Sequence, residues 1–405
     1  MTGCTFKRKL PSGRVVWGFS IDAGKDDAGR RKRIYRSGYK FQRDAEAALR
    51  RVAQEHDDGL LVRPDPRTID DFFEQWFREY AKFNCTQKTV EHYRELARHV
   101  TKHVGQVELG KLTPLQLQRV YNILLVSGKK DGKPLSKRTV RHVHGLVHIA
   151  LETAVKWRLL KLNPSDACTL PPLPEREATA IDQHETQRYV AACKEHWSGN
   201  LLCMAAATAA RRGELLALRW SDINLAAGAM FIRRSLEQTK ECGLRVKDTK
   251  GRRLRKIGLD HETIEVLEEI RKEQEQLRAL FGDKYKTELD LVFCQSDGSF
   301  IRPDVVTKAA RRLAKQAGLA GVSLHTLRHS HGSQLLSLGV PLPTVSKRLG
   351  HANVNVTATI YAHALPNDEA EAAAIWAQGM KAVKESDTPE QAQKKLQVIR
   401  GRRSA

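Results

Sequence analysis

The sequence lacks the features that mark several common classes of protein. It has no apolar run long enough to span a bilayer and no apolar segment of the kind found in a secretory signal peptide. Its seven cysteines form no C-x-x-C pair and are odd in number, which argues against a structural zinc site and against a complete disulfide framework. A Walker-type phosphate loop and an internal repeat are also absent. We therefore expect a protein of the reducing cytoplasm that needs neither membrane nor ATP.

Negative charge is scarce. The 405 residues include 69 Lys and Arg but only 47 Asp and Glu, which gives a formal net charge of +22 and a pI near 9.8. This excess indicates a polyanionic partner, most commonly a nucleic acid, although ribosomal and membrane-surface proteins are basic as well. The length predicts two or three domains, each with its own core. The chemistry of the site must decide between these partners.

One stretch concentrates groups that could carry chemistry. It begins at His325 and reads HTLRHSHGSQLLSLGVPLPTVSKRLGHANVNVTATIY. Its apolar spacing predicts two packed helices, with His325 and Arg328 one turn apart on the same face and Gly350 as the C-cap of the second. His351 and Tyr361 follow. A phenol, two imidazoles and a guanidinium suit attack on a phosphodiester, since they can supply the nucleophile, the proton carriers and a clamp for the non-bridging oxygens.

Two further motifs complete a pattern that resembles the tyrosine recombinases of the phage-integrase class and, more distantly, the type IB topoisomerases. TAARRGELLALRWSDI (residues 208–223) matches the family's first active-site box, which assigns its arginine to Arg211 and its acidic partner to Glu214. DTKGRRLRKIGL (residues 248–259) matches the hairpin that carries the family's lysine, here Lys250. The stretch described above matches the second box. Six positions in the right order make this resemblance specific.

The resemblance implies DNA cleavage without a metal. Tyr361 would attack the DNA backbone and leave a 3′-phosphotyrosyl enzyme and a free 5′ hydroxyl, so that religation needs no ATP. Because a phenol has a pKa of about 10, its proton must be removed during attack. Arg211 and Arg328, with a donor from His351, would stabilise the charge that develops on the equatorial oxygens. Composition alone does not exclude Tyr80 or Tyr93 as the nucleophile, and only the resemblance selects Tyr361.

The remaining roles concern protons. The resemblance implies that His325 accepts or shares the tyrosine proton and that Lys250 donates a proton to the departing 5′ oxygen. Glu214 would orient an active-site arginine or histidine. The cluster of His325, His329 and His331 could suggest zinc, but no cysteine or carboxylate stands nearby at ligand spacing. We therefore expect neither a metal nor a cofactor.

The same resemblance predicts a mostly α fold with small β-sheets (α+β) and three domains. We expect a three-stranded arm-type DNA-binding domain in 1–62 and a helical, SAM-like core-binding domain in 66–166. A proline-rich linker would occupy 167–177, the tyrosine-recombinase catalytic domain 178–385, and a flexible tail 386–405.

The N-terminal region is strongly basic. Residues 1–43 carry twelve Lys and Arg against three Asp. RVVWGFSID and RRKRIYRSGY alternate large and polar residues, as strands do, and a helix should follow with Asp44 as its N-cap. Trp17, Tyr35 and Tyr39 lie among the cations, as in a sheet that reads a DNA groove. A solvated basic hairpin is the alternative.

Basic residues also crowd two helices predicted for the core-binding domain, at 87–104 and at 136–160, the latter with Ser136 as its cap. Thr68 should cap an earlier helix of the same domain. Any one of these basic residues could belong to an ordinary solvated face, but the set favours phosphate contacts. The DNA-binding candidates of both regions are Arg14, Arg31, Lys32, Arg33, Lys88, Arg94, Arg98, Lys102, Lys137, Arg138, Arg141 and His142.

In the catalytic domain, we expect a helix over 200–219 that holds both Arg211 and Glu214, and a short sheet over 229–259. An amphipathic helix at 369–383 follows the nucleophile. Related recombinases dock such a helix on a neighbouring protomer, which predicts a homotetramer on double-stranded DNA attachment sites. An excisionase or a host DNA-bending factor would be a further partner.

The function predicted is that of an integrase, which integrates and excises a mobile element in the nucleoid-associated cytoplasm. Two alternatives stay open from sequence. One is a DNA-binding regulator that kept the fold but lost its chemistry, against which all six filled positions speak. The other is a type IB topoisomerase, which would act as a monomer, whereas the arm-like domain and the tail helix favour a tetrameric recombinase.

Overall fold

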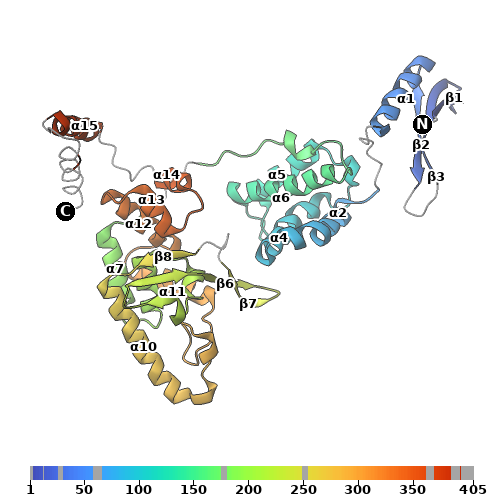
Figure 1. Cartoon of the computed structure of the whole chain (residues 1–405). Helices are drawn as coiled ribbons and strands as arrows, with labels where there is room; N and C mark the ends of the chain where they lie inside the picture. The colour runs from blue at the N-terminus through green and yellow to red at the C-terminus, as the bar shows by residue number, and fades with distance from the viewer. Residues whose placement is uncertain are drawn as a thin grey trace. The chain divides into compact units, whose positions relative to one another are not determined.

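The protein is described by a computed structural model that divides into two compact units, Met1–Pro174 and Glu175–Ala405. The boundary between the units lies in the proline-rich segment, and the finer division into domains stays a prediction. The fold is mostly helical with small antiparallel sheets, as expected (Figure 1). The residues described are 3–11, 13–25, 31–57, 66–174, 180–248, 254–361, 369–384 and 393.

The N-terminal part of the first unit is a three-stranded antiparallel sheet in the order β1-β2-β3, followed by one helix. Phe19 and Ile21 of the central strand pack against Val52 of the helix and form a small buried core. The helix begins at Gln42, so the prediction of Asp44 as its N-cap is wrong, and Asp44 lies in the first turn. The elements are β1 (Gly3–Lys9), β2 (Val15–Lys25), β3 (Arg31–Tyr39) and α1 (Gln42–Asp57).

The rest of the first unit is a helical body with its own core. Thr68 and Ser136 cap their helices through their hydroxyls, as predicted. The indole of Trp76 is fully buried and donates to Thr153 Oγ1 at 3.1 Å. The elements are α2 (Ile69–Trp76), η1 (Phe77–Ala81, a π-helical turn), α3 (Lys82–Asn84), α4 (Gln87–Val104), η2 (Leu109–Lys111), α5 (Pro114–Ser127), α6 (Lys137–Lys156) and η3 (Pro164–Ala167).

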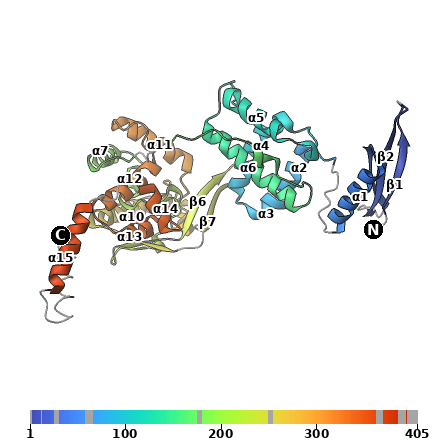
Figure 2. The same cartoon turned by 90° about the horizontal axis from the view of Figure 1, so that it is seen from above.

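The second unit packs helices around two small β structures. β4, β5 and β8 form one antiparallel sheet, and β6 and β7 form a separate hairpin that projects from it (Figure 2). The single sheet expected over 229–259 is therefore wrong. Up to η6 the elements are α7 (Gln183–Cys193), α8 (Gly199–Thr208), α9 (Arg212–Leu215), η4 (Trp220–Asp222), β4 (Ile223–Asn224), β5 (Ala229–Ile232), β6 (Arg234–Thr239), β7 (Gly243–Asp248), β8 (Arg255–Gly258), α10 (His261–Phe281), η5 (Gly282–Lys284) and η6 (Thr287–Leu289).

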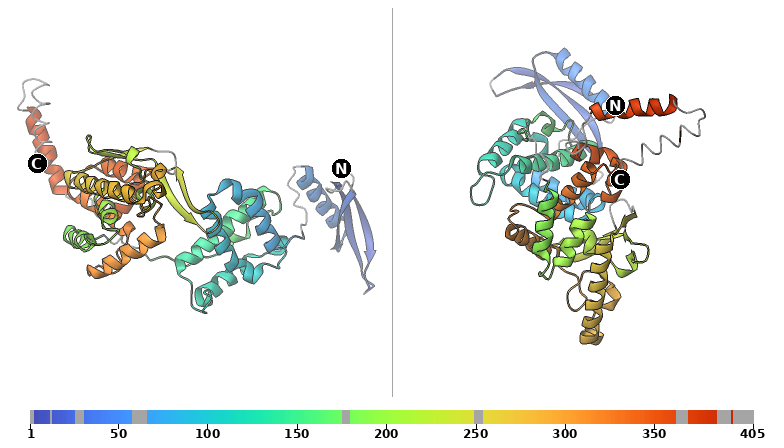
Figure 3. Two further views of the ribbon diagram at one scale, coloured as in Figure 1. Left: turned by 90° about the horizontal axis from the view of Figure 1, so that it is seen from below. Right: turned by 90° about the vertical axis from the view of Figure 1, so that its left-hand side faces the viewer.

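The helices that follow carry three of the candidate residues, His325 and Arg328 on α12 and Tyr361 on α14. They are α11 (Pro303–Gln316), α12 (Leu324–Ser337), α13 (Leu342–Leu349), α14 (Val354–Tyr361) and α15 (Glu369–Lys384). α12 packs on α8 and α13, and α13 packs on α14 and β8, so these elements meet on one side of the unit. The long helix α10 extends away from them (Figure 3). Its Gln274 donates to the carbonyls of Leu291 and Val292 and fixes the returning segment.

The expected helix over 200–219 is broken, and the break matters for the site. α8 ends because Ala209 takes a left-handed conformation, with φ of 52°. The hydroxyl of Thr208 donates to Met204 O at 2.6 Å, which closes the last turn. Arg211 is extended and forms the N-cap of the short helix α9. The strain at Ala209 is offset by a tertiary contact, because Arg328 Nη1 donates to its carbonyl at 2.7 Å.

Candidate active site

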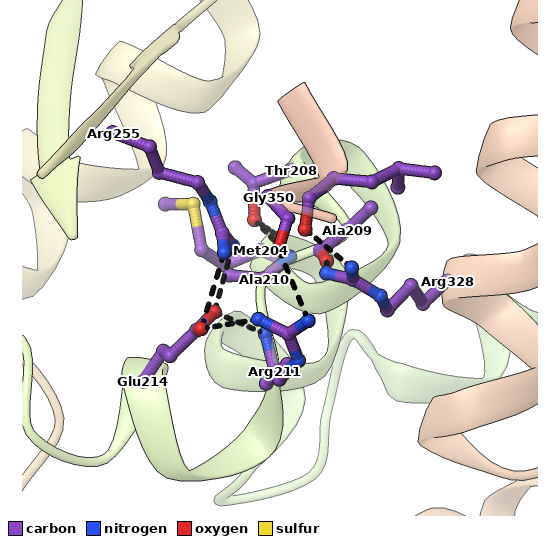
Figure 4. Close-up of polar contacts among 10 residues, drawn as sticks. Met204, Thr208, Ala209, Ala210, Arg211, Glu214, Arg255, Arg328 and Gly350 are labelled. Atoms are coloured by element: carbon purple, nitrogen blue, oxygen red, sulfur yellow. Dashed lines mark hydrogen bonds and ion pairs between the residues drawn. The ribbon is translucent and has the colours of Figure 1, made fainter. Parts of the chain in front are cut away.

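Arg211 lies in the break between α8 and α9, and 49% of its side chain is exposed. Its Nη1 lies 2.9 Å from Glu214 Oε1, and its backbone N–H donates to Glu214 Oε2 at 2.8 Å (Figure 4). Its Nη2 also donates to Gly350 O at 3.3 Å. The carboxylate of Glu214 thus holds both the backbone and the guanidinium of Arg211 and fixes the direction of its side chain. The free edge of the guanidinium is open to an anionic ligand.

Arg328, on α12, is buried, with 4% of its surface exposed. It donates to the carbonyls of Ala209 and Leu349. Burial lowers the pKa of Arg328 to about 10, with a further contribution from the charge of Arg211, so the side chain stays positive at neutral pH. The two arginines together hold the consecutive carbonyls of Leu349 and Gly350, which the C-terminus of α13 leaves unpaired.

His351 follows immediately after Gly350, whose φ of 66° turns the chain out of α13. Its Nδ1 lies 2.8 Å from Thr357 Oγ1. Burial, then the charges of Arg328 and Arg211, lower the pKa of His351 to about 4, so the imidazole is neutral at pH 7. When the Thr357 hydroxyl donates to Nδ1, the single ring proton is on Nε2. His351 is then a neutral donor of fixed orientation.

Tyr361 ends α14 and is completely buried. Its hydroxyl lies 3.2 Å from Nδ1 of His329, and Nε2 of His329 lies 2.9 Å from Nε2 of His325. Burial raises the pKa of Tyr361, and the charge of Arg328 offsets part of this effect. Burial, then Arg328 and Arg211, lower the pKa of His325. His329 rather than His325 therefore lies within hydrogen-bonding distance of the phenol, and the ring of His351 stacks beside Tyr361 with 6.4 Å between ring centres.

The structure brings together Arg211, Glu214, Arg328, His351 and Tyr361. His325 lies one hydrogen bond further out, and Lys250 lies outside the described residues. Sequence reasoning missed three residues of the site, for which only weak signals exist in the sequence. They are His329, which is one helical turn after His325; Thr357, which has no distinguishing motif; and Arg255, which is one of several basic residues in GRRLRK.

The DNA-binding candidates lie mostly on exposed surface. Arg94 differs, because it pairs with Glu74 at 3.2 Å and lies 4.5 Å from the ring centre of Phe77. Arg141 donates to Pro171 O. The side chains of Arg31 and Lys32 lie outside the described residues. The exposed candidates are Arg14, Arg33, Lys88, Arg98, Lys102, Lys137, Arg138, Arg141 and His142.

The described residues contain neither a metal-binding cluster nor a membrane-spanning helix. No group of three or more His, Cys, Asp or Glu side chains among them could hold a metal ion. No described helix is both long and apolar enough to cross a membrane. The site is instead rich in cations, since Arg211 and Arg255 both contact the carboxylate of Glu214 and Arg328 contacts the carbonyls of Ala209 and Leu349. Such a site suits a phosphate in a buried setting.

A helical body ahead of the second unit in the chain, and a site with a buried tyrosine among arginines and histidines, are the features expected of a tyrosine-dependent DNA strand transferase. The model of the phage integrase family matches residues 179–368, and that of the phage integrase N-terminal SAM-like domain matches residues 68–125. The chain belongs to the phage integrase family of tyrosine recombinases, and its activity is site-specific DNA recombination.

Individual relatives agree with this assignment. The chain is 26% identical over 392 residues to a tyrosine recombinase XerC-like protein of Caldanaerobacter subterraneus, covering 90% of this chain and 96% of the relative. It is 28% identical to an integrase of Streptomyces ambofaciens, with 86% and 89% covered. In fold it resembles the Tn1549 transposon integrase in complex with a circular intermediate DNA, with a TM-score of 0.64, 17% identity, and 76% and 98% covered. Neither the inactive regulator nor the topoisomerase draws support from these likenesses.

Proposed function

We propose that Tyr361 is the nucleophile of the recombinase and that His329 takes its proton. The observation that carries this proposal is the contact of 3.2 Å between the Tyr361 hydroxyl and His329 Nδ1. In the proposed step, the phenol oxygen attacks phosphorus and its proton passes to Nδ1. The second nitrogen of His329 can pass its own proton to His325, which lies 2.9 Å away. The sequence prediction that His325 acts directly becomes a proposal that it acts through His329.

The same proposal assigns the anion-binding groups. Arg211 and Arg328 stabilise the charge on the equatorial oxygens, and neutral His351 donates one hydrogen bond without adding charge. Lys250 protonates the departing 5′ oxygen, so that the 3′-phosphotyrosyl bond forms as the phosphodiester bond breaks. Two arginines around a buried phosphate supply the electrostatic stabilisation that metal ions supply in many nucleases.

Burial of the nucleophile requires that α14 move before attack. Tyr361 packs against α12 so closely that a Cβ added at Gly332 would lie 2.8 Å from its hydroxyl. Its ring also belongs to a core cluster with Ala209, Leu336, Val345 and Leu349. We propose that DNA binding shifts α14 enough to bring the phosphate held by the arginines next to the phenol, while the hydroxyl stays in contact with His329.

The substrate proposed is a double-stranded DNA attachment site, engaged by the basic surfaces of both units while the protein forms a homotetramer. Residues 1–62 would bind arm-type sites, 66–166 the core site, and 178–385 would catalyse. This proposal is supported by the charge of +22 and by the lambda integrase dimer bound to a core site, whose fold the chain resembles with a TM-score of 0.55. The protein would act in the nucleoid-associated cytoplasm, with an excisionase or host DNA-bending factor setting direction.

The test is a denaturing-gel assay for a covalent protein–DNA adduct. Overlapping duplexes that tile the DNA flanking the coding sequence are labelled at the 5′ end, because the tyrosine retains the 5′ fragment through its 3′ phosphate. We expect an adduct with the wild type and none with Tyr361→Phe, although both bind DNA. An adduct from Tyr361→Phe would overturn the assignment. Tight binding without an adduct from either protein would favour an inactive regulator.

A further inference from the structure

Arg255 is the most deeply buried cation near the site that no catalytic role accounts for. It lies on β8, where its backbone pairs with Ile232 of β5, and only 8% of its surface is exposed. In the sequence it stands five positions after Lys250. Burying a guanidinium in this way is costly unless it is paired and hydrogen-bonded. Its partner therefore indicates what it does.

That partner is Glu214, which is itself 3% exposed. The two side chains form a bidentate pair, with Arg255 Nη1 donating to Oε1 at 3.1 Å and Nη2 to Oε2 at 2.7 Å (Figure 4). Each of these oxygens also accepts one hydrogen bond from Arg211. The carboxylate is thus shared, with Arg255 holding it on the buried side and Arg211 on the side open to solvent.

Arg255 also supports the turn before His351. A Cβ added at Gly350 would lie 2.4 Å from Arg255 Nη1 and 2.8 Å from its Cδ, so the guanidinium packs directly against this glycine. Gly350 O in turn accepts a hydrogen bond from Arg211. One side chain therefore contacts both the carboxylate that orients Arg211 and the glycine that positions His351.

We propose that Arg255 is a positioning residue for strand cleavage. It fixes Glu214 so that the guanidinium of Arg211 faces the scissile phosphate. It also holds Gly350 so that His351 faces the same phosphate. This inference rests on the proposed roles of Arg211 and His351, and it concerns a residue that need not touch DNA.

Arg255 can hold Glu214 in one orientation because of the shape of its guanidinium group. A planar guanidinium matches both carboxylate oxygens at once, whereas a lysine ammonium is a point charge that cannot hold the carboxylate plane. Without Arg255, Arg211 would be the one remaining contact of the Glu214 carboxylate named above that opposes the effect of burial on its pKa. Burial raises the pKa of Glu214. In the folded protein the charge of Arg255, and after it the backbone N–H and guanidinium of Arg211, lower this pKa below its usual value.

The test compares Arg255→Met and Arg255→Lys with the wild type in single-turnover adduct formation on the duplex that gives an adduct with the wild type. We expect the cleavage rate of Arg255→Met to fall by about 100-fold at neutral pH, the scale expected when a catalytic group is displaced by about 1 Å. DNA affinity should change by no more than about twofold, because Arg255 is buried away from the ligand. A rate for Arg255→Met within about twofold of the wild type would overturn the proposal.

The pH profile of the cleavage rate and a double-mutant cycle distinguish a positioning role of Arg255 from a purely structural one. The rate of Arg255→Met should fall further as the pH is lowered, since Glu214 then becomes protonated, and Arg255→Lys should restore the wild-type pH profile but not the full rate. In a double-mutant cycle, Arg255→Met should cost little more once Glu214→Gln is present. Additive losses, or an unchanged pH profile in Arg255→Met, would show that Arg255 only supports the fold.

A matched control is Arg348→Met. Arg348 is also a largely buried arginine, but it donates to Ala207 O, Gly258 O and His331 rather than to an active-site carboxylate. We expect it to lower thermal stability while leaving the shape of the pH profile unchanged. If the wild type itself forms no adduct, the proposed function fails; if the wild type reacts and Arg255→Met reacts equally well, only this inference fails.

Discussion

The imidazole of His329 contacts the hydroxyl of Tyr361 directly, with 3.2 Å between Nδ1 and Oη. The second ring nitrogen meets His325 at 2.9 Å. Three side chains from two helices thus form a chain that leads from the buried phenol to an exposed imidazole. Because one ring nitrogen faces each neighbour, His329 can take a proton on one side and release one on the other.

A pair of substitutions tests this relay. His329→Asn keeps an amide near the position of Nδ1, and His329→Gln keeps one near Nε2, but neither side chain titrates. We expect both variants to lower the single-turnover rate of adduct formation by about 100-fold, the usual contribution of general acid–base catalysis. DNA affinity, measured by gel shift, should stay near that of the wild type. If both variants react at nearly the wild-type rate, His329 is a packing residue.

Replacing Glu214 should destabilise the fold as well as the site. Glu214→Gln leaves Arg255 buried without its counter-charge, and breaking a buried pair from one side costs about 3–5 kcal/mol of unfolding free energy. The control is Glu108→Gln, whose partner Lys111 lies 2.7 Å away on the surface. We expect the control to change stability by less than about 1 kcal/mol. Equilibrium urea unfolding measures both, and equal losses would contradict the buried role of Glu214.

His331 should make the catalytic unit sensitive to acid. Its Nδ1 lies 3.0 Å from Ala206 O and its Nε2 accepts from Arg348, so the folded protein holds the neutral ring. Burial, then the charge of Arg348, lower the pKa of His331 to about 4 from 6.5. The unfolded chain therefore binds the proton first, and stability is lost as the pH falls from 6.5 towards 4.

The shift corresponds to a loss of about 3 kcal/mol over that window from this one residue. Urea unfolding at pH 7 and pH 5 measures it, and His331→Asn should show a smaller difference between the two pH values. An equal pH dependence in the variant and the wild type would mean that His331 does not carry the effect. His351, with its pKa also near 4, adds a loss of the same sign.

Salt dependence separates the two kinds of basic residue on α4. Arg98 is exposed, whereas Arg94 pairs with Glu74 and lies over the ring of Phe77. Arg98→Ala should reduce the slope of log K against log salt by about 0.9, the value for one lost phosphate contact. Arg94→Ala should leave that slope nearly unchanged and lower stability instead. Fluorescence anisotropy over a salt series measures the slope, and equal slopes in Arg98→Ala and the wild type would remove Arg98 from the interface.

The sequence by itself determined much of this protein. Hydrophobic spacing and capping residues predicted the helices after Thr68 and Ser136, because these signals are local and act within one turn. The order of Arg211, Arg328 and Tyr361 in their motifs predicted the class of chemistry. What identified the chemistry was the residue types and their spacing, which do not depend on where the side chains finally point.

The tertiary structure decided what depends on contacts between distant segments. The break after Thr208 escaped prediction, because a carbonyl contact from Arg328, 119 residues away, supports the left-handed Ala209. The choice of His329 over His325 as the partner of Tyr361 depends on how α14 packs on α12. The pairing of Arg255 with Glu214 joins a strand to a short helix across 41 residues. No local pattern encodes such pairings, because their energies arise only when the segments meet.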